Sequence, residues 1–97
     1  MYFVSLAPSS RQNKKYELIL SNAEGRTKTY HFGSKGSQTY LDHKDKIKRA
    51  NYIARHSARE NWSEINAGSL SRYILWGDST DLNTNLKQYL KRFKISR

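Results

Sequence analysis

The spacing of apolar residues changes near Tyr40, and this change constrains the fold more than any other feature of the 97-residue chain. Before it, three short runs rich in β-branched and aromatic residues (2–6, 16–20 and 27–32) are separated by turn-forming clusters, a pattern typical of strands. After it, apolar residues recur every three or four positions, as they do along helices. We therefore predict an α+β fold, in which a small N-terminal antiparallel three-stranded β-meander packs on about three C-terminal α-helices.

The length of the chain allows one domain, residues 1–97, divided into the meander (1–32), a glycine-rich connector (33–41) and a helical part (42–97). Only 36% of the residues are hydrophobic but 12% are aromatic, so we expect aromatic rings to supply much of the core. The absence of cysteine excludes a disulfide-stapled module, a thiolate nucleophile and the common zinc-ribbon ligand sets. No apolar run approaches twenty residues, so we expect a soluble protein without a membrane span.

Two acidic residues mark the predicted start of the first long helix. Asp42 is followed three positions later by Asp45, a spacing that resembles a capping box, and Ile47 and Ile53 then recur at helical spacing. We predict one helix from about His43 to Glu60, with the two isoleucines on its buried side.

Two further helical segments are predicted nearer the end of the chain. The apolar run 70–76 should be largely buried, and Gly77 should end it as a left-handed C-cap. A last helix should open at Ser79, with Asp81 in its first turn, where the helix dipole favours a carboxylate. Its apolar stripe consists of Leu82, Leu86, Tyr89, Leu90 and Phe93.

Eighteen Lys and Arg residues stand against eight Asp and Glu residues, which gives a formal net charge of +10. Charge of this size favours encounter with polyanions or acidic surfaces, although it does not specify a fold. One face of the first helix is formed by Lys44, Lys48, Tyr52, Arg55 and Arg59. This basic stripe suits contact with phosphates, with Tyr52 stacked on a base or a sugar. The alternative is a solvated helix face supported by an Asp45–Arg49 pair.

The last helix carries a second basic face opposite its apolar stripe. This face is formed by Lys87, Lys91 and Lys94. Arg72 falls between apolar neighbours, so we expect it either to pair with Glu60 or Glu64 or to project into a partner. All of these cations are candidate residues for binding a polyanion or an acidic partner.

Candidate catalytic groups are few and form no recognisable motif. They are His31, Asp42, His43, Asp45, His56 and Glu60. The two aspartates have an ordinary capping role at a helix start, and no HNH, HExxH or paired-acid signature is present. The segment 31–36 lacks the GxxxxGK[ST] pattern, so a connector between strand and helix is favoured over an anion-binding nest. We therefore predict no enzyme activity, no cofactor, no metal and no small-molecule substrate.

Five groups of residues, in this order along the chain, carry a resemblance. They are His31-Phe32-Gly33; Tyr40 with Asp42-His43-Lys44-Asp45; Arg55-His56 with Arg59-Glu60-Asn61-Trp62; Ala67-Gly68 with Leu70 to Trp76; and Tyr89 with Lys91-Arg92-Phe93. Over about residues 16–93 the chain resembles a family of small basic proteins of nucleocytoplasmic large DNA viruses, the mimivirus and phycodnavirus groups. The resemblance implies a viral origin and a place in the virion, and it assigns no catalytic residues.

Charge and resemblance together give three candidate functions. We favour a virion structural protein, in the minor capsid or between capsid and core, that binds acidic surfaces through its basic helix faces. The alternative is a non-sequence-specific DNA-binding protein that condenses DNA in the viral core, and a metal-dependent nuclease is a distant third. The expected partners are viral capsid or core proteins, DNA or both. The expected location is the virion and, during assembly, the host cytoplasm or nucleus, and a homo-oligomer is compatible with each role.

Overall fold

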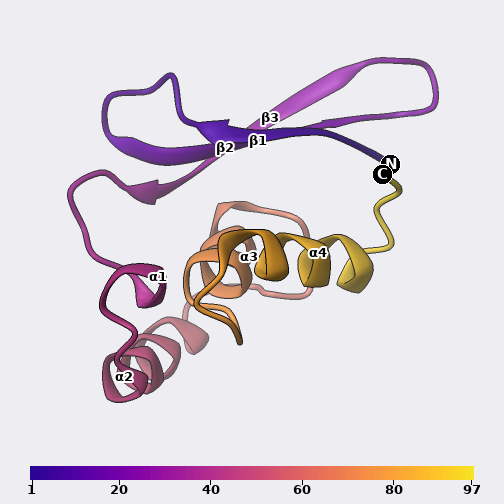
Figure 1. Ribbon diagram of the computed structural model, residues 1–97. Helices are drawn as coiled ribbons and strands as arrows, with labels where there is room; N and C mark the ends of the chain where they lie inside the picture. The colour runs from indigo at the N-terminus through magenta and orange to yellow at the C-terminus, as the bar shows by residue number, and fades with distance from the viewer.

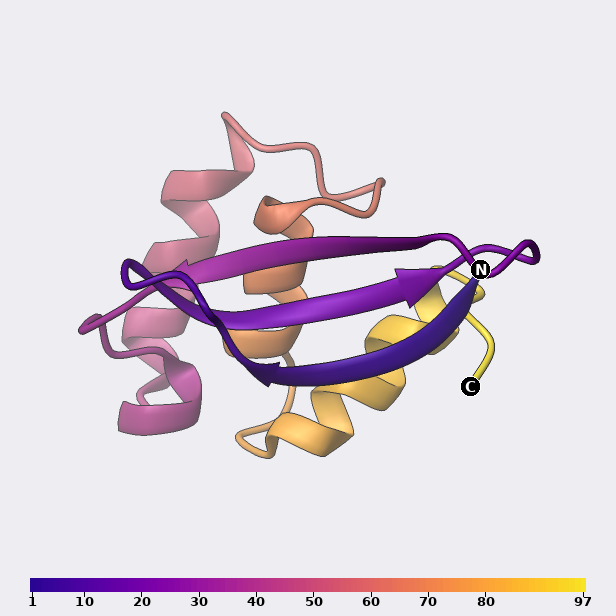
Figure 2. The same cartoon turned by 90° about the horizontal axis from the view of Figure 1, so that it is seen from above.

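Residues 1–97 form two layers in the computed structural model, a three-stranded sheet and a set of helices that covers one face of it (Figure 1). The elements, in chain order, are β1 (Tyr2–Pro8), β2 (Lys14–Ser21), β3 (Thr27–Ser34), α1 (Tyr40–His43), α2 (Lys46–Ser57), α3 (Ala67–Leu70), the π-helix η1 (Ser71–Leu75) and α4 (Leu82–Arg92). Seen from above, α2, then α3 with η1, then α4 follow one another from left to right behind the sheet (Figure 2). The α+β fold predicted from the sequence is confirmed. None of the helices has both the length and the apolar character that crossing a membrane requires.

The sheet is an antiparallel meander with the strand order β1-β2-β3, as predicted. Leu18 of β2 pairs with Leu6 of β1 and with Tyr30 of β3, and side chains alternate along β2 and β3 between the helical layer and the open face. In β1 a register shift between Phe3 and Ser5 interrupts this alternation. Gly33 and Ser34, predicted to belong to the connector, instead extend β3. Gly33 has a φ of 79°, a conformation that favours glycine, so the strand continues through a position where the sequence indicated a break.

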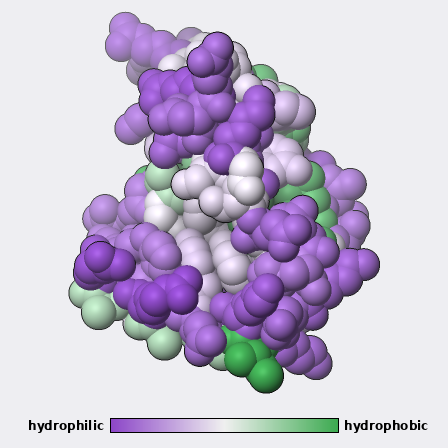
Figure 3. Space-filling view, turned by 90° about the vertical axis from the view of Figure 1, so that its left-hand side faces the viewer, coloured by the Kyte–Doolittle hydropathy of each residue, from purple (hydrophilic) through white to green (hydrophobic).

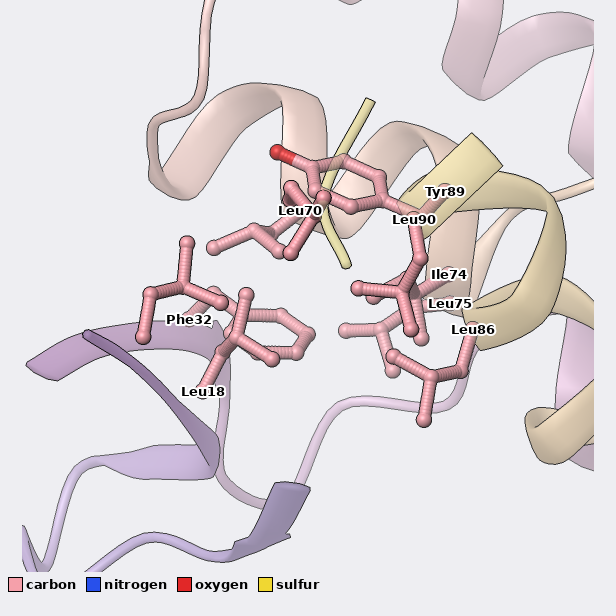
Figure 4. Close-up of a cluster of buried hydrophobic side chains, with 10 residues drawn as sticks. Leu18, Phe32, Leu70, Ile74, Leu75, Leu86, Tyr89 and Leu90 are labelled. Atoms are coloured by element: carbon pink, nitrogen blue, oxygen red, sulfur yellow. The ribbon is translucent and has the colours of Figure 1, made fainter. Parts of the chain in front are cut away.

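One hydrophobic core fills the space between the two layers. Side chains of the sheet, such as Leu18 and Phe32, face those of the helices (Figure 4). The ten buried residues of this core are Leu18, Leu20, Phe32, Leu70, Ile74, Leu75, Leu86, Tyr89, Leu90 and Ile95. Tyr89 places its hydroxyl oxygen 2.8 Å from Ser69 Oγ, so its polar atom is satisfied inside the core. The predicted apolar stripe of the last helix is confirmed, with Leu82 and Phe93 at the margin of the cluster.

The predicted single helix from His43 to Glu60 is wrong, because two helices occupy this region. Lys44 lies between them with a φ of 57° and a ψ of 27°, a left-handed conformation that ends α1. Each predicted capping residue serves a different helix. Asp42 accepts the backbone N–H of Thr39 at 2.7 Å in α1, while Asp45 accepts two backbone N–H groups in the first turn of α2.

The side of α2 that faces the rest of the molecule is polar and aromatic rather than aliphatic. Its members are Arg49, Tyr52 and His56, and the one aliphatic residue beside them is Ile53, which is partly buried as predicted. Ile47, predicted to be buried, is 74% exposed. Arg49 Nε donates to the carbonyl oxygen of Trp76 at 3.1 Å, and its Nη2 lies 2.9 Å from a carboxylate oxygen of Asp78. The predicted Asp45–Arg49 pair is therefore wrong, and Arg49 attaches α2 to the turn that follows η1.

The buried run 70–76 is helical, as predicted, but it ends in a different way. It continues α3 as the π-helix η1, and Gly77 follows without taking a left-handed conformation. Gly77 is required for space: a Cβ atom there would overlap the carbonyl oxygen of Tyr73 and lie 2.8 Å from Oδ1 of Asn85. The C-cap prediction for Gly77 is therefore wrong in its physical cause.

Asn85 is fully buried beneath the turn between η1 and α4. Its Nδ2 donates to the carbonyl oxygens of Ile74 at 2.9 Å and Ser79 at 2.7 Å, and its Oδ1 accepts the backbone N–H of Ser79 at 3.0 Å. These three hydrogen bonds fix the turn. The last helix begins at Leu82 with Asp81 as its N-cap, not at Ser79 as predicted.

The two ends of the chain lie side by side at the edge of β1 (Figure 1). Ser96 forms a parallel bridge with Tyr2. The backbone N–H of Phe3 donates to the carbonyl oxygen of Ser96 at 2.7 Å. The backbone N–H of Ser96 donates to the carbonyl oxygen of Met1 at 2.9 Å. The C-terminal segment thus covers the first part of an otherwise open strand edge.

Candidate polyanion-binding groove

A groove opens between the connector that follows β3 and the helices α2 and α3. Its larger part has a volume of about 470 Å³, and a smaller part of about 250 Å³ adjoins it. Gln38, Arg55 and Trp76 line both parts, so the two form one continuous groove. Figure 3 faces this end of the molecule, where hydrophilic residues cover the upper and lower parts of the surface and paler residues lie between them.

Stacked aromatic rings form the floor of the groove and hold α2 in place. The ring of Tyr52 is stacked on that of His56, with 4.1 Å between centroids, and on that of Trp76, with 4.2 Å between centroids and an interplanar angle of 4°. His43 contacts Trp76 as well, at 5.2 Å. Tyr52 is only 8% exposed and both of its faces are covered. The prediction that Tyr52 stacks on a base or sugar is therefore wrong, because its ring is used inside the fold.

Arg72 is engaged within the protein and pairs with neither of the two glutamates predicted for it. Its Nη1 donates to the carbonyl oxygen of Trp76 at 3.1 Å. Its guanidinium also lies 5.3 Å from the ring centroid of Trp62 and 4.9 Å from that of Tyr73, within cation–π range. Burial lowers the pKa of Arg72, and the charge of Arg49 lowers it further. These contacts explain its place among apolar neighbours without a partner.

A hydrogen-bonded pair, His56 and Glu60, lines the larger part of the groove. His56 Nδ1 lies 2.7 Å from Glu60 Oε2, and Trp62 Nε1 donates to Glu60 Oε1 at 2.8 Å. Burial raises the pKa of Glu60, but the hydrogen bonds from His56 and Trp62 outweigh burial and leave this pKa below its ordinary value. The charge of Glu60 is therefore directed at two donors of the protein itself.

The rim of the groove is basic. Arg55 lines both parts, Lys48 lines the smaller part and Lys14 lines the larger part. Lys48 and Arg55 are exposed and come from α2, where their spacing placed them on one face. Lys44 and Arg59 are also exposed but lie outside the lining of the groove. The predicted stripe on one helix face is therefore wrong: Lys44 and Arg59 lie outside α2, Tyr52 faces inward, and only Lys48 and Arg55 reach the groove.

The second predicted basic face lies on another part of the molecule. Lys87, Lys91 and Lys94 are exposed on and just after α4, which Figures 1 and 2 place at the opposite end of the helical layer from α2. None of the three lines the groove. The three lysines of the last helix and the basic residues at the rim of the groove thus lie on two separate surfaces.

The acidic residues neutralise almost none of this positive charge. Of the eighteen Lys and Arg side chains, only Arg49 forms an ion pair with a carboxylate, that of Asp78. Asp42, Asp45 and Asp81 instead cap helices, and the hydrogen bonds that they accept there lower the pKa of all three. Their charge is directed at backbone N–H groups, so the exposed lysine and arginine side chains other than Arg49 and Arg72 have no carboxylate that competes with an external anion.

The six candidate catalytic groups do not converge on one site. His31 lies in β3 with its Nδ1 2.8 Å from Ser9 Oγ, and His43 lines the smaller part of the groove. The other four are the two capping aspartates and the His56–Glu60 pair. No group of three or more His, Asp or Glu residues is placed to hold a metal ion.

Many residues of the groove were not predicted as site residues, and the most informative are Lys14, Gln38 and Trp76. They come from the start of β2, from the connector and from the end of η1, so no local spacing connects them. Trp76 was assigned to the core, and its position next to Tyr52 could be found only from the folded chain. The basic stripe on α2 was the only part of the groove with a sequence signal.

The protein is expected to lose stability as the pH rises from about 10 to about 12. Burial raises the pKa of Tyr52 and of Tyr89 to about 12, whereas tyrosine in an unfolded chain ionises near 10. Between these values the unfolded state binds fewer protons than the folded state, so the free energy of unfolding falls with rising pH. Urea titrations on either side of pH ~10 measure this fall. Tyr52→Phe should make this fall in the free energy of unfolding smaller. If the fall is unchanged in that variant, the raised pKa of Tyr52 does not contribute to it.

The fold and the groove together define a small α+β module with an unneutralised basic rim. Residues 4–56 match the profile of a family of unknown function, DUF5754. Because the match spans more than half of the chain, the protein belongs to this family. The matched region includes most of the sheet, α1 and most of α2. No curated protein and no solved structure matches the chain.

Proposed function

We propose that this protein binds the phosphate backbone of nucleic acid through the exposed basic side of α2 and the groove beside it, without reading base sequence. One observation carries the proposal: of eighteen Lys and Arg side chains, only Arg49 is neutralised by a carboxylate. Unpaired cations bind phosphates with release of condensed counterions, and such contacts need no recognition of bases.

The covered rings beside α2 support backbone contact over base stacking. Proteins that bind single strands without sequence preference stack bases on exposed aromatic side chains. Here Tyr52 is buried, and the large apolar side chains that are exposed are Met1, Tyr2, Val4 and Ile47. Only Ile47 belongs to α2, and it is not aromatic. A duplex, which offers phosphates and no free base face, fits this surface better than a single strand.

A second candidate is a structural role in the virion, the function implied by the resemblance to proteins of large DNA viruses. It is favoured by three exposed apolar side chains at the start of β1, Met1, Tyr2 and Val4, which are 54%, 46% and 50% exposed. Exposed apolar side chains close together favour contact with another protein. In this role the basic groove would bind an acidic protein surface of the capsid or core.

The affinity for duplex DNA is expected to fall steeply with salt. Contact with about six to eight phosphates gives a slope of about −5 to −7 in a plot of log affinity against log salt concentration. Fluorescence anisotropy of a labelled duplex in a series of salt concentrations measures this slope. A flat response would reject nucleic-acid binding and leave the structural role as the better candidate.

Charge reversal on α2 and just before and after it tests which surface binds. Changing Lys44, Lys48, Arg55 and Arg59 together to Glu is expected to abolish duplex binding and to shift Tm by only a few degrees, because exposed charges contribute little to folding. The matched control reverses Arg26, Lys87, Lys91 and Lys94, which changes the net charge equally but spares the groove. Equal loss of binding in both variants would show that binding is not specific to the surface beside the groove. Unfolding of the first variant would show that these side chains stabilise the fold.

A further inference from the structure

The smaller part of the groove is lined by hydrogen-bond donors and by no carboxylate. Its lining residues are Gln38, His43, Lys48, Asn51, Arg55 and Trp76. Lys48 and Arg55 supply positive charge, while the two amide side chains supply further N–H groups. A pocket of this composition favours an anion that accepts several hydrogen bonds at once.

His43 adds a donor that no group of the protein accepts. Its Nδ1 accepts the backbone N–H of Asp45 at 3.0 Å, so the proton of the neutral ring is assigned to Nε2. Nε2 is buried and has no hydrogen-bond partner. Buried donors without an acceptor are rare, because nothing compensates the loss of water. His43 also lines the pocket, so an anion there would supply the missing acceptor once a shift of the covering side chains uncovers Nε2.

The ring of His43 is held in place by its neighbours. It lies 5.2 Å from the ring of Trp76 and meets the ring of Tyr40 edge-on at 6.4 Å, in addition to its hydrogen bond to Asp45. A donor fixed before binding loses little conformational freedom when the ligand arrives. The ring of His43 is therefore held beside the pocket, and Lys48 and Arg55 line the pocket from α2.

We propose that this pocket binds one phosphate group through the Nε2–H of His43, the ammonium of Lys48 and the guanidinium of Arg55. The guanidinium presents a planar fork that matches two oxygens of a tetrahedral phosphate, and Lys48 adds a compact charge. The inference rests on the proposed function, in which the phosphate is one diester of a nucleic-acid backbone. Inorganic phosphate or a small phosphorylated molecule has the same chemistry and is the other source to be tested.

Two substitutions at His43 separate its two nitrogens. In His43→Asn the amide oxygen replaces Nδ1 as the acceptor for Asp45 but no donor replaces Nε2, whereas in His43→Gln the amide nitrogen replaces Nε2 but no acceptor replaces Nδ1. We expect His43→Asn to weaken duplex binding about tenfold, as for the loss of one hydrogen bond to a charged group, and His43→Gln to stay within about threefold of wild type. If His43 served only to order the backbone, His43→Gln would be the weaker binder, and the proposal would be overturned.

Lys48→Ala and Lys46→Ala form a matched pair on one helix. Each removes one exposed lysine from α2, but only Lys48 lines the pocket. We expect about a tenfold loss of affinity for Lys48→Ala and about a twofold loss for Lys46→Ala. Equal losses of affinity in the two variants would overturn the proposed phosphate pocket. The proposed function would still stand if the affinity of the wild type for duplex DNA falls steeply with salt. Thermal unfolding of each variant checks that the fold is intact.

Inorganic phosphate as a second probe distinguishes the two sources. Its addition to isotope-labelled protein should shift the Nε2 resonance of His43 in the wild type and much less in Lys48→Ala. If phosphate and duplex compete and both depend on His43 and Lys48, the pocket binds the nucleic-acid backbone. If phosphate binding alone depends on them, the pocket stands but its ligand is a small phosphate compound. If neither depends on them, the pocket does not bind phosphate.

Discussion

Gly77→Ala is expected to be among the most destabilising single substitutions in this chain. The added methyl group would overlap the carbonyl oxygen of Tyr73 and lie 2.8 Å from Oδ1 of Asn85. The carbonyl belongs to the backbone of η1, and a shift of Asn85 would break the three hydrogen bonds that fix the next turn. We expect a loss of about 3 to 5 kcal/mol in the free energy of unfolding, and a Tm lower by at least about 12 °C. Calorimetry or thermal circular dichroism measures both.

Gly25→Ala is the matched control for this substitution. It adds the same atom in a hairpin turn where no other atom lies within 4 Å of the new Cβ, although the φ of 85° strains any other residue. This conformational strain alone should cost about 1 kcal/mol. If Gly77→Ala costs no more than Gly25→Ala, the tight packing of the turn does not limit stability.

Trp76→Ala is expected to release α2 while the core remains folded. Trp76 provides the ring on which Tyr52 stacks, and it belongs to the floor of the groove. Its backbone carbonyl oxygen, to which Arg49 donates, is kept in this variant, so the expected loss comes from the ring. Removing a large aromatic side chain costs about 3 to 5 kcal/mol, and here the cost should fall mainly on one helix. Hydrogen exchange should show faster exchange for the amides of α2 and unchanged protection in β2 and α4. Duplex binding should fall in parallel, because the cations of α2 lose their fixed position.

Trp76→Phe is the conservative control, since it keeps an aromatic ring against Tyr52. It should retain most of the protection of α2 and most of the binding. If Trp76→Ala instead raised exchange equally throughout the molecule, Trp76 would belong to the global core, and the local attachment of α2 would be refuted.

The sheet and the last helix could be predicted because their buried residues are the apolar ones. Leu18, Leu20 and Phe32 alternate along strands, and the stripe of α4 follows the helical period. The helix α2 could not be predicted in the same way, because its inner side consists mainly of Arg49, Tyr52 and His56, residue types that are usually partly exposed. The break before α2 was missed because a lysine, and not a glycine, takes the left-handed conformation there.

The groove was predictable only where it lies within one helix. Lys48 and Arg55 have a spacing that places them on one face, whereas Lys14 reaches the rim from a strand far away in the sequence. Asn85 was missed because a polar residue in a helix is normally exposed, and its buried amide is explained only by the turn packed above it. Packing between distant segments, and not local propensity, determines these positions.

The bridge between Tyr2 and Ser96 makes the first strand depend on a segment that is translated long after it. Until that segment has been translated, the edge of β1 lacks this partner and the core lacks Ile95. The meander can therefore form early, but the finished domain requires the segment that contains Ile95 and Ser96. For the same reason, fluorophores attached to the two ends would lie next to each other only after folding is complete, so their energy transfer would report the final closure of the molecule.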